Sequence, residues 1–384
     1  DNFFKKGPSN RGAFSRLQRT RPIHRLPDQS LRRAFPVCIL AVLSYNRVMT
    51  RFRLPLSALL LWVLLLRPGI LFAFHFDSLP IDCTGNELCI IQNYFDRDPG
   101  SFARDHACGF LTYDGHEGTD FRVSRADMER GVPVLAVADG MVRAVRDGQS
   151  DGEMSRRGKG ALRGREAGNA VAVTHGDGFE TQYSHLRQGS VRVKTGERVR
   201  AGQVLGLVGQ SGMADFPHVE LLVRRGRTAF CPFVGPEVGP GCAVKGTPLW
   251  SEERLAVAPL AYRPTGLLRA GFVVKPPGSV NHFLDNSLLP ARGGDPDALL
   301  FCVAVFGTRT GDKISLRLLG PDGVVLARDA LDFERTQAQS MFYVGRKRNN
   351  RWPAGTYRGE FLLQRPGDLG EGGTLRLSRD IVLP

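Results

Sequence analysis

The sequence lacks several signals that would decide its class at once. Its seven cysteines include no Cys-x-x-C pair, so a zinc site built from cysteine thiolates is not expected. The apolar run at 54–66 is shorter than the roughly 18–20 residues that a bilayer-spanning helix needs. The chain after residue 73 also lacks a basic surplus. Residues 1–53 carry 12 Lys and Arg against two Asp, so most of the net charge of +14 lies there. About +3 remains for residues 74–384. A nucleic-acid partner is not expected, because such binders need a basic face on the folded domain.

The front of the chain is typical of targeting sequence. Met49 opens a segment with two early arginines, the apolar run 54–66 and a small residue near Ala73, which is the order of features in a secretory signal peptide. An uncleaved membrane anchor is the alternative. Residues 1–48 do not begin with Met and show no periodic pattern, so we expect them to be non-native upstream sequence. We therefore predict an exported protein, periplasmic or in the cell envelope, that meets the membrane only through residues 49–73.

Cysteine usage agrees with export. Six cysteines fall after the predicted signal peptide, and an even set in an oxidising compartment favours disulfides. These are Cys83, Cys89, Cys108, Cys231, Cys242 and Cys302. Cys231 and Cys242 are the best local pair, because they would close a Gly- and Pro-rich loop. The connectivity of the other four stays open.

The rest of the chain is predicted to be all-β. We expect an irregular lead-in at 74–104, an antiparallel β-sheet domain at 105–250, a linker with a leading strand at 251–298 and a β-sandwich-like domain at 299–384. The last region shows strand-length segments at a spacing typical of a sandwich, and it contains no cluster of chemically reactive side chains.

Turn residues divide the first β-domain into hairpins. Residues 132–145 predict two strands joined at Asp139-Gly140, and residues 168–186 predict two more around the turn at 176–178. The segment 147–168 has no hydrophobic period and predicts a mobile surface loop.

Two segments supply pairs of metal-binding side chains. His116 and Asp120 lie four residues apart, but Gly118 between them argues against the helix that a His-Glu-x-x-His motif requires. Such a glycine instead lets the backbone turn, so that both side chains can meet at one ion. His218 and Glu220 share one strand face, because strand side chains repeat every two residues.

Two further histidines accompany these pairs. His175 lies in a Gly-rich turn, and His185 lies on the alternation of a strand. A single histidine on a strand is usually a hydrogen-bonding residue without catalytic function. In this order, and within Gly-rich hairpins, the set as a whole indicates a site.

These motifs resemble those of the lysostaphin-type (LytM-like) zinc endopeptidases that cut peptidoglycan. Residues 116–120 match the family's H-x-x-x-D, residues 183–186 its Y-x-H-L, and residues 216–220 the run that ends in P-H-x-H. The resemblance covers about a third of the chain, from about 110 to 226. It implies an antiparallel β-sheet peptidase domain and one Zn²⁺ per chain.

The resemblance also implies roles for individual residues. His116 and Asp120 would bind Zn²⁺, and His185 and His218 would be catalytic. His175 would support its turn, which is a structural role.

Glu220 departs from the family pattern, because the third zinc ligand there is histidine. Glutamate is an acceptable zinc ligand. It shares a strand face with His218, so we expect Glu220 to be the third ligand. Arg224 lies on the same face by parity and is the alternative partner of this carboxylate.

The implied function is exported, zinc-dependent hydrolysis of peptide bonds in peptidoglycan. The alternative is a metal-poor, non-cleaving relative that binds peptidoglycan or regulates a cell-wall hydrolase, with a cell-envelope protein as partner. Residues 196–212 also resemble the hairpins of biotin- or lipoyl-carrying domains, but Lys194 precedes the turn rather than occupying its tip. A carrier domain is therefore not expected.

Overall fold

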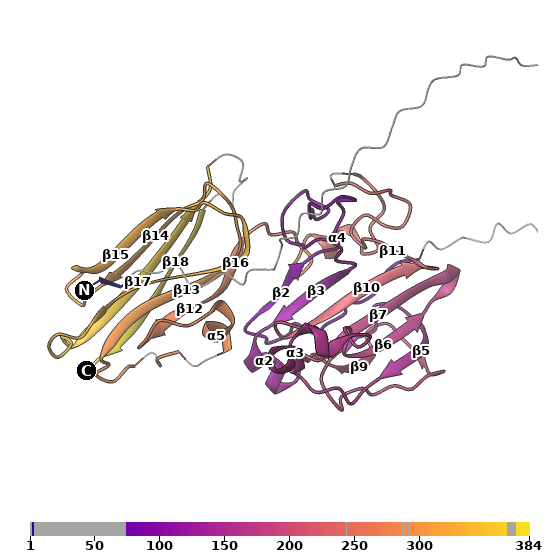
Figure 1. Cartoon of the computed structure of the whole chain (residues 1–384), viewed down its shortest axis with the longest axis horizontal. Coiled ribbons are helices and arrows are strands. Elements are labelled where there is room, and N and C mark those ends of the chain that lie inside the picture. Colours follow the sequence, from indigo (N-terminus) through magenta and orange to yellow (C-terminus); the bar gives the residue numbers. More distant parts are fainter. Residues whose placement is uncertain (1, 4–73, 243, 286–287, 291, 367–373) are drawn as a thin grey trace, which may run out of the picture. The chain divides into compact units, whose positions relative to one another are not determined.

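The computed structural model describes residues 2–3, 74–242, 244–285, 288–290, 292–366 and 374–384. The predicted signal peptide at 49–73 lies outside these residues, as does the upstream segment 1–48 except for residues 2–3. Within the described ranges, no helix is long and apolar enough to cross a membrane. Most of the regular structure is β, as predicted (Figure 1). The helical segments are α2 (Arg125–Arg130), α3 (Glu153–Arg157), α4 (Glu252–Leu255), α5 (Val280–Asp285), η1 (Lys159–Leu162) and η2 (Gly176–Gly178).

An antiparallel sheet forms the first region of the fold. Its strand order is β2-β3-β10-β7-β6-β5-β8, and β11 pairs with β10. The strands are β2 (Cys89–Asn93), β3 (Gly118–Val123), β5 (Gly140–Arg146), β6 (Asn169–Thr174), β7 (Phe179–Leu186), β8 (Arg198–Val199), β10 (His218–Arg225) and β11 (Thr228–Ala229). A separate ladder joins β4 (Pro133–Leu135) to β9 (Val204–Leu207).

Alternation of side chains explains why β10 forms a strand at the centre of this sheet. Val219, Leu221 and Val223 are at most 1% exposed and pack into the core, so the intervening residues face the other side. The neighbouring β6 and β7 form the predicted hairpin. In its turn Asp177 and Gly178 take φ values of +57° and +75°, which glycine adopts without steric cost.

The predicted hairpin at Asp139-Gly140 is wrong. β4 pairs with β9, whereas β5 pairs with β6 and β8. The reason is that residues 136–138 are buried and cross from one ladder to the other. Asp139 accepts a hydrogen bond from the amide of Ala201, so it stabilises a distant turn instead of forming its own.

Two other segments are more ordered than the sequence predicts. The segment 147–168 holds α3 and η1, and its Leu162 is fully buried. The lead-in 74–104 contains β2, which pairs with β3. A lead-in that was expected to be irregular therefore contributes a strand beside the candidate site.

The C-terminal region is a β-sandwich of two four-stranded sheets. One sheet has the order β1-β16-β13-β12 and the other β15-β14-β17-β18. The strands are β1 (Asn2–Phe3), β12 (Gly266–Val273), β13 (Ala298–Thr308), β14 (Lys313–Leu319), β15 (Val325–Asp332), β16 (Gln337–Lys347), β17 (Gly355–Gln364) and β18 (Thr374–Leu383). Since β12 pairs with β13, the first sheet includes a strand before residue 299, inside the segment predicted to be a linker with a leading strand.

The predicted Cys231–Cys242 disulfide is wrong, and so is the expectation that every cysteine is paired. The disulfides are Cys83–Cys89 and Cys108–Cys242, whereas Cys231 and Cys302 are free and buried. Arg97 explains the difference, because its main chain and side chain hydrogen-bond Gly241. These bonds hold the cysteine loop against the lead-in and place Cys242 beside Cys108.

Candidate metal centre

The predicted site residues meet where β3 and β10 lie side by side. In this antiparallel register Asp120 is opposite Glu220, and Glu220 is also opposite Ser184 of β7. Directly opposite residues carry their side chains on the same face, with Cβ atoms about 5 Å apart. Three strands thus bring together side chains that are up to a hundred positions apart in the sequence.

His116 lies just before β3 and is held on both sides. Its Nδ1 donates to the carbonyl oxygen of Tyr94 at 2.8 Å, which leaves Nε2 to face Asp120 Oδ1 at 3.2 Å. The ring of Tyr113 stacks on the imidazole, with the centroids 4.4 Å apart. His116 is 2% exposed. An imidazole fixed through Nδ1 in this way is arranged as a metal ligand usually is.

Glu220 reaches into the same cluster. Its Oε1 lies 3.6 Å from Nε2 of His116, and its Oε2 lies 3.6 Å from Nε2 of His185. A Cβ atom on Gly118 would come within 2.5 Å of Cγ of Glu220, so the absence of a side chain at 118 makes room for the glutamate. The alternative partner Arg224 instead pairs with Glu180 at 2.9 Å. Glu220 therefore lies in the cluster with His116, and its role as a metal ligand stays a prediction.

His185 and His218 form the other side of the cluster, with ring centroids 4.6 Å apart. Nδ1 of His185 donates to the carbonyl of Ser211, and Nδ1 of His218 donates to that of Phe216, each at 2.8 Å. His218 Nε2 lies 3.7 Å from Oδ1 of Asp120. Both imidazoles thus direct Nε2 toward the carboxylates.

His185 has a backbone conformation that few residues with a side chain adopt. Its φ is +65°, in the left-handed region, which costs about 1–3 kcal/mol for a residue other than glycine. Its amide donates to the carbonyl of Ala167 at 2.9 Å, which stabilises this conformation together with the bond to Ser211. Strain kept at such a position is a mark of a functional residue.

Sequence reasoning missed Asn93. Its Nδ2 donates to Oδ2 of Asp120 at 2.7 Å, and both side chains are buried. This bond leaves Oδ1 of Asp120 facing His116 and His218. The signal that could have identified Asn93 is the apolar run before it, which marks β2 as a strand.

The cluster changes the protonation of its members. Burial acts to lower the pKa of His116, but Asp120 and Glu220 outweigh it and raise the pKa to about 10. Burial also disfavours the ionised form of Glu220, but His116 and His185 hold the pKa of this carboxyl well below its usual range. Burial opposes protonation of His185 as well, yet the contact with Glu220 raises its pKa. In His218 burial prevails and lowers the pKa to about 4, despite the attraction of Asp120.

These residues fit a bound divalent cation. His116, Asp120 and Glu220 each offer one ligand atom, and these atoms lie within 4.8 Å of one another. A buried and a half-buried carboxylate so close together need positive charge to stabilise them. Imidazole and carboxylate donors together suit Zn²⁺ and other transition metals.

The remaining predicted structural residues lie in other surroundings. His175 bonds the carbonyl of Asp139 through Nδ1 at 2.7 Å and the hydroxyl of Thr181 through Nε2 at 2.9 Å. These contacts join the end of β6 to the segment before β5, which agrees with a structural role. Cys231 packs in the hydrophobic core.

Comparison with known proteins gives a family for this region. Residues 114–232 match the model of peptidase family M23. A stretch of 111 residues is 35% identical to the peptidoglycan DD-endopeptidase ShyA of Vibrio cholerae and 32% identical to the DD-carboxypeptidase/endopeptidase Mpg of Neisseria meningitidis. Each alignment covers 28% of this chain and 20% of the relative, so the chain spans about a fifth of the length of either protein.

Solved structures were compared as well. The catalytic domain of lysostaphin from Staphylococcus simulans aligns at 22% identity and a TM-score of 0.24, over 36% of this chain and 85% of that one. The sequence match covers every member of the cluster except Asn93. The region that holds the cluster therefore matches peptidase family M23, a family of metallopeptidases, over residues 114–232.

Proposed function

We propose that the chain is an exported, zinc-dependent endopeptidase that hydrolyses peptide bonds in peptidoglycan, with residues 105–250 as its peptidase domain. The observation that carries the proposal is the buried cluster in which His116, Asp120 and Glu220 converge within 4.8 Å. The family match supports peptide hydrolysis, and of the two relatives described above ShyA is by name a peptidoglycan endopeptidase and Mpg a carboxypeptidase/endopeptidase. Because the chain spans only a fifth of their length, the substrate is itself part of the proposal.

In this proposal His116, Asp120 and Glu220 hold one Zn²⁺. A zinc ion with three protein ligands and one open position supplies an activated water and polarises the carbonyl to be attacked. The chain's own contribution is to fix the donor atoms. Tyr94 orients the imidazole of His116 and Asn93 orients the carboxylate of Asp120, as hydrogen-bonded neighbours of metal ligands generally do.

His218 and His185 divide the proton chemistry between them. His218 is neutral at pH 7 because burial lowers its pKa to about 4, and its Nδ1–H is committed to Phe216. Its Nε2 lone pair is therefore free to accept a proton from the attacking water. His185 lies beside Glu220, which raises its pKa, and its Nε2 faces that carboxylate. In its protonated form His185 would donate a hydrogen bond from Nε2 to the oxygen that gains negative charge.

The alternative of a metal-poor, non-cleaving relative rests on Glu220 alone. That residue lies within the cluster, where it contacts His116 and His185. A carboxylate in this position maintains the donor set, and both proposed catalytic histidines are present. The geometry therefore favours hydrolysis.

Incubation of the full chain with purified peptidoglycan tests the proposal. We expect soluble peptide fragments with new amino termini, loss of the activity on chelation and recovery on addition of Zn²⁺. The His116→Ala variant should be inactive, and Arg317→Ala in the sandwich is a matched control that should cleave normally. Binding of the full chain to peptidoglycan without release of fragments, in the presence of Zn²⁺, would instead establish the non-cleaving alternative.

Export is proposed from the signal-like segment at 49–73. We expect secreted material to begin near Phe74. Mass spectrometry of the exported protein would measure its first residue, and retention of residues 49–73 in a membrane fraction would favour the uncleaved anchor.

A further inference from the structure

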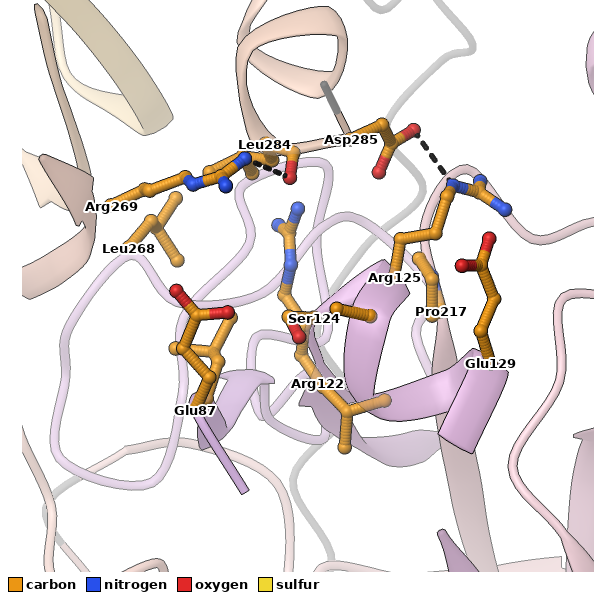
Figure 2. A pocket seen from close by; sticks show the side chains of 13 residues that line it. Glu87, Arg122, Ser124, Arg125, Glu129, Pro217, Leu268, Arg269, Leu284 and Asp285 are labelled. Carbon is orange, nitrogen blue, oxygen red and sulfur yellow. Dashed lines mark hydrogen bonds and ion pairs between the residues drawn. The ribbon is translucent and has the colours of Figure 1, made fainter. Parts of the chain in front are cut away.

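A cavity of about 200 Å³ lies beside the metal centre, along β3 beyond Asp120 (Figure 2). It is bordered by the end of β3, the start of α2, and parts of β12 and α5. The hydrogen bond from Arg269 to Leu284 and the ion pair of Arg125 with Asp285 are drawn as dashed lines. None of the three residues of the metal-type cluster lines this cavity.

Arg122 is the most unusual of these side chains. It is 2% exposed, and its Nη1 donates to the amide oxygens of Gln92 and Gln339, each at 2.9 Å. Its guanidinium lies 4.3 Å above the ring of Phe216. Among the described residues, its buried Nε has no hydrogen-bond partner. Asp285 attracts this guanidinium electrostatically, but among the described residues no carboxylate forms an ion pair with it. Its buried Nε therefore keeps a donor that a bound acceptor would satisfy.

Two further guanidinium groups border the same space. Nε of Arg125 lies 3.2 Å from Oδ2 of Asp285, and Nη1 of Arg269 donates to the main-chain carbonyls of Phe283 and Leu284. Figure 2 shows the side chain of Arg122 standing between Arg269 and Arg125. The three cations therefore surround a cavity of limited size.

The rest of the lining limits what the cavity can hold. Leu88, Leu268 and Leu284 give it apolar walls, whereas Glu87 and Glu129 place exposed carboxylates at its border. With Asp285, the acidic groups equal the three arginines in number, so the lining lacks the positive surplus that a dianion such as phosphate would need. The volume is below the roughly 300–1,000 Å³ of most ligand pockets, which favours a small ligand. A guanidinium fork is well matched to a carboxylate.

We propose that this cavity binds a small organic carboxylate, with the guanidinium of Arg122 as its main contact. The apolar walls suit a short aliphatic group attached to the carboxylate, as at the end of a peptide. This proposal does not depend on peptide hydrolysis, because it concerns binding alone.

Binding at Arg122 should affect His218. Arg122 is opposite His218 in the ladder between β3 and β10, so both side chains lie on one face of the sheet. Phe216 connects them, because its ring also contacts the His218 imidazole at a centroid distance of 4.7 Å. An anion that orders Arg122 therefore changes the surroundings of the imidazole without touching the metal ligands.

Titration of the full chain with N-acetylalanine tests the proposal. N-acetylalanine amide is the matched uncharged probe, acetate tests whether the carboxylate alone is enough, and inorganic phosphate tests for general anion binding. We expect saturable calorimetric binding of N-acetylalanine, unchanged by a chelator, with a shift of the His218 ring signals in the NMR spectrum. Acetate should bind more weakly, and the amide should not bind.

Variants locate the site. Arg122→Gln should weaken N-acetylalanine binding by about tenfold or more, because a hydrogen-bonded charge contributes more than a neutral contact. Arg269→Gln, on the opposite wall, should also weaken N-acetylalanine binding. If Arg122→Gln does not fold, the Arg269→Gln variant tests the location of the site. Arg225→Gln is the matched control, since Arg225 pairs with the exposed Glu237 elsewhere.

Four results would overturn the proposal: no saturable binding of N-acetylalanine, equal binding of the amide, tighter binding of phosphate, or loss of binding on chelation. The last would place the carboxylate on the metal instead. Wild-type affinity in folded Arg122→Gln would also exclude this cavity. Equal binding of acetate and N-acetylalanine would remove the role given to the apolar walls.

Discussion

The two β regions of this chain have different interiors. Among the described residues, buried polar or charged side chains number 20 between residues 92 and 218 but only three in the sandwich, namely Thr308, Asp312 and Ser340. The sandwich core is almost wholly apolar, with β13 buried along its entire length. Burial of a polar group is costly unless it is hydrogen-bonded. The many buried polar side chains of the first region therefore indicate a role beyond stability. The apolar core of the sandwich is the reference for a core that only stabilises the fold.

Removal of the imidazoles of His185 and His218 should have the largest effect on activity. His218→Ala and His185→Ala should each lower peptidoglycan cleavage by roughly 10²–10⁴-fold, the usual contribution of a positioned acid or base. The unfolding free energy and the zinc content should stay close to wild type, because Asp120 and Glu220 remain in place. Turnover on purified peptidoglycan, measured with metal analysis on the same samples, would check this. Near-normal turnover in either variant would remove that histidine from the mechanism.

In the sandwich, by contrast, loss of a buried charged residue should lower stability and leave activity unchanged. Asp312 is fully buried and makes a bidentate ion pair with Arg365, through Nε at 2.6 Å and Nη2 at 2.9 Å. Asp312→Ala leaves Arg365 buried without its partner, which should cost about 3–5 kcal/mol of stability. Peptidoglycan cleavage per folded molecule should not change. Urea denaturation and an activity assay on the folded fraction would measure both quantities.

A change in activity alone, without loss of stability, would show that Asp312 has a role beyond folding. The Arg358–Asp380 pair offers a control, because it is exposed and Asp380→Ala should cost less than about 1 kcal/mol.

The third test concerns the residue that departs from the family pattern. Glu220→Ala should lower zinc affinity by at least the roughly 10–100-fold that loss of a ligand's hydrogen-bonded neighbour costs. Glu220→His should keep zinc, and the activity profile should move to lower pH because one negative charge is removed from the donor set. Competition with a chromogenic chelator and activity against pH would measure these effects. Wild-type zinc affinity in Glu220→Ala would show that Glu220 is not a ligand.

Much of the site was predictable because its spacing is local. Strand parity places His218 and Glu220 on one face. The turn expected at Gly118 is not there, because Gly118 opens β3 and makes room for the side chain of Glu220. What parity cannot show is which strands become neighbours. Asn93 was missed for this reason, since it reaches Asp120 only through the pairing of β2 with β3.

The errors elsewhere have the same origin. The Cys108–Cys242 disulfide closes a separation of 134 residues and depends on the bonds from Arg97, which no local pattern reveals. Asp139-Gly140 has the composition of a hairpin turn, but burial of residues 136–138 sends β4 and β5 to different ladders. Arg122 likewise looks like an ordinary strand residue until its burial is known.

The smallest effect comes from a buried carboxylate in the first region that does not belong to the site. Asp127 is fully buried at the start of α2, and it accepts hydrogen bonds from the amides of Glu87 and Leu88 and from the Ser124 hydroxyl. Burial opposes its ionisation, but these bonds and Arg130 outweigh it and lower the pKa of Asp127. Asp127→Asn should cost about 1–2 kcal/mol at pH 7.

The pH dependence of this cost tests the assignment. A carboxyl whose pKa is lower in the folded chain stabilises the fold above its unfolded pKa of about 3.9 and loses this contribution as the pH falls through the folded pKa. The difference in unfolding free energy between wild type and Asp127→Asn should therefore shrink as the pH falls below about 3.9. Urea titrations at pH 7 and pH 3 would measure it, with zinc content at pH 7 as the control. An unchanged difference at both values would mean that packing around Asp127, and not its charge, stabilises α2, while a loss of zinc would extend the site to this helix.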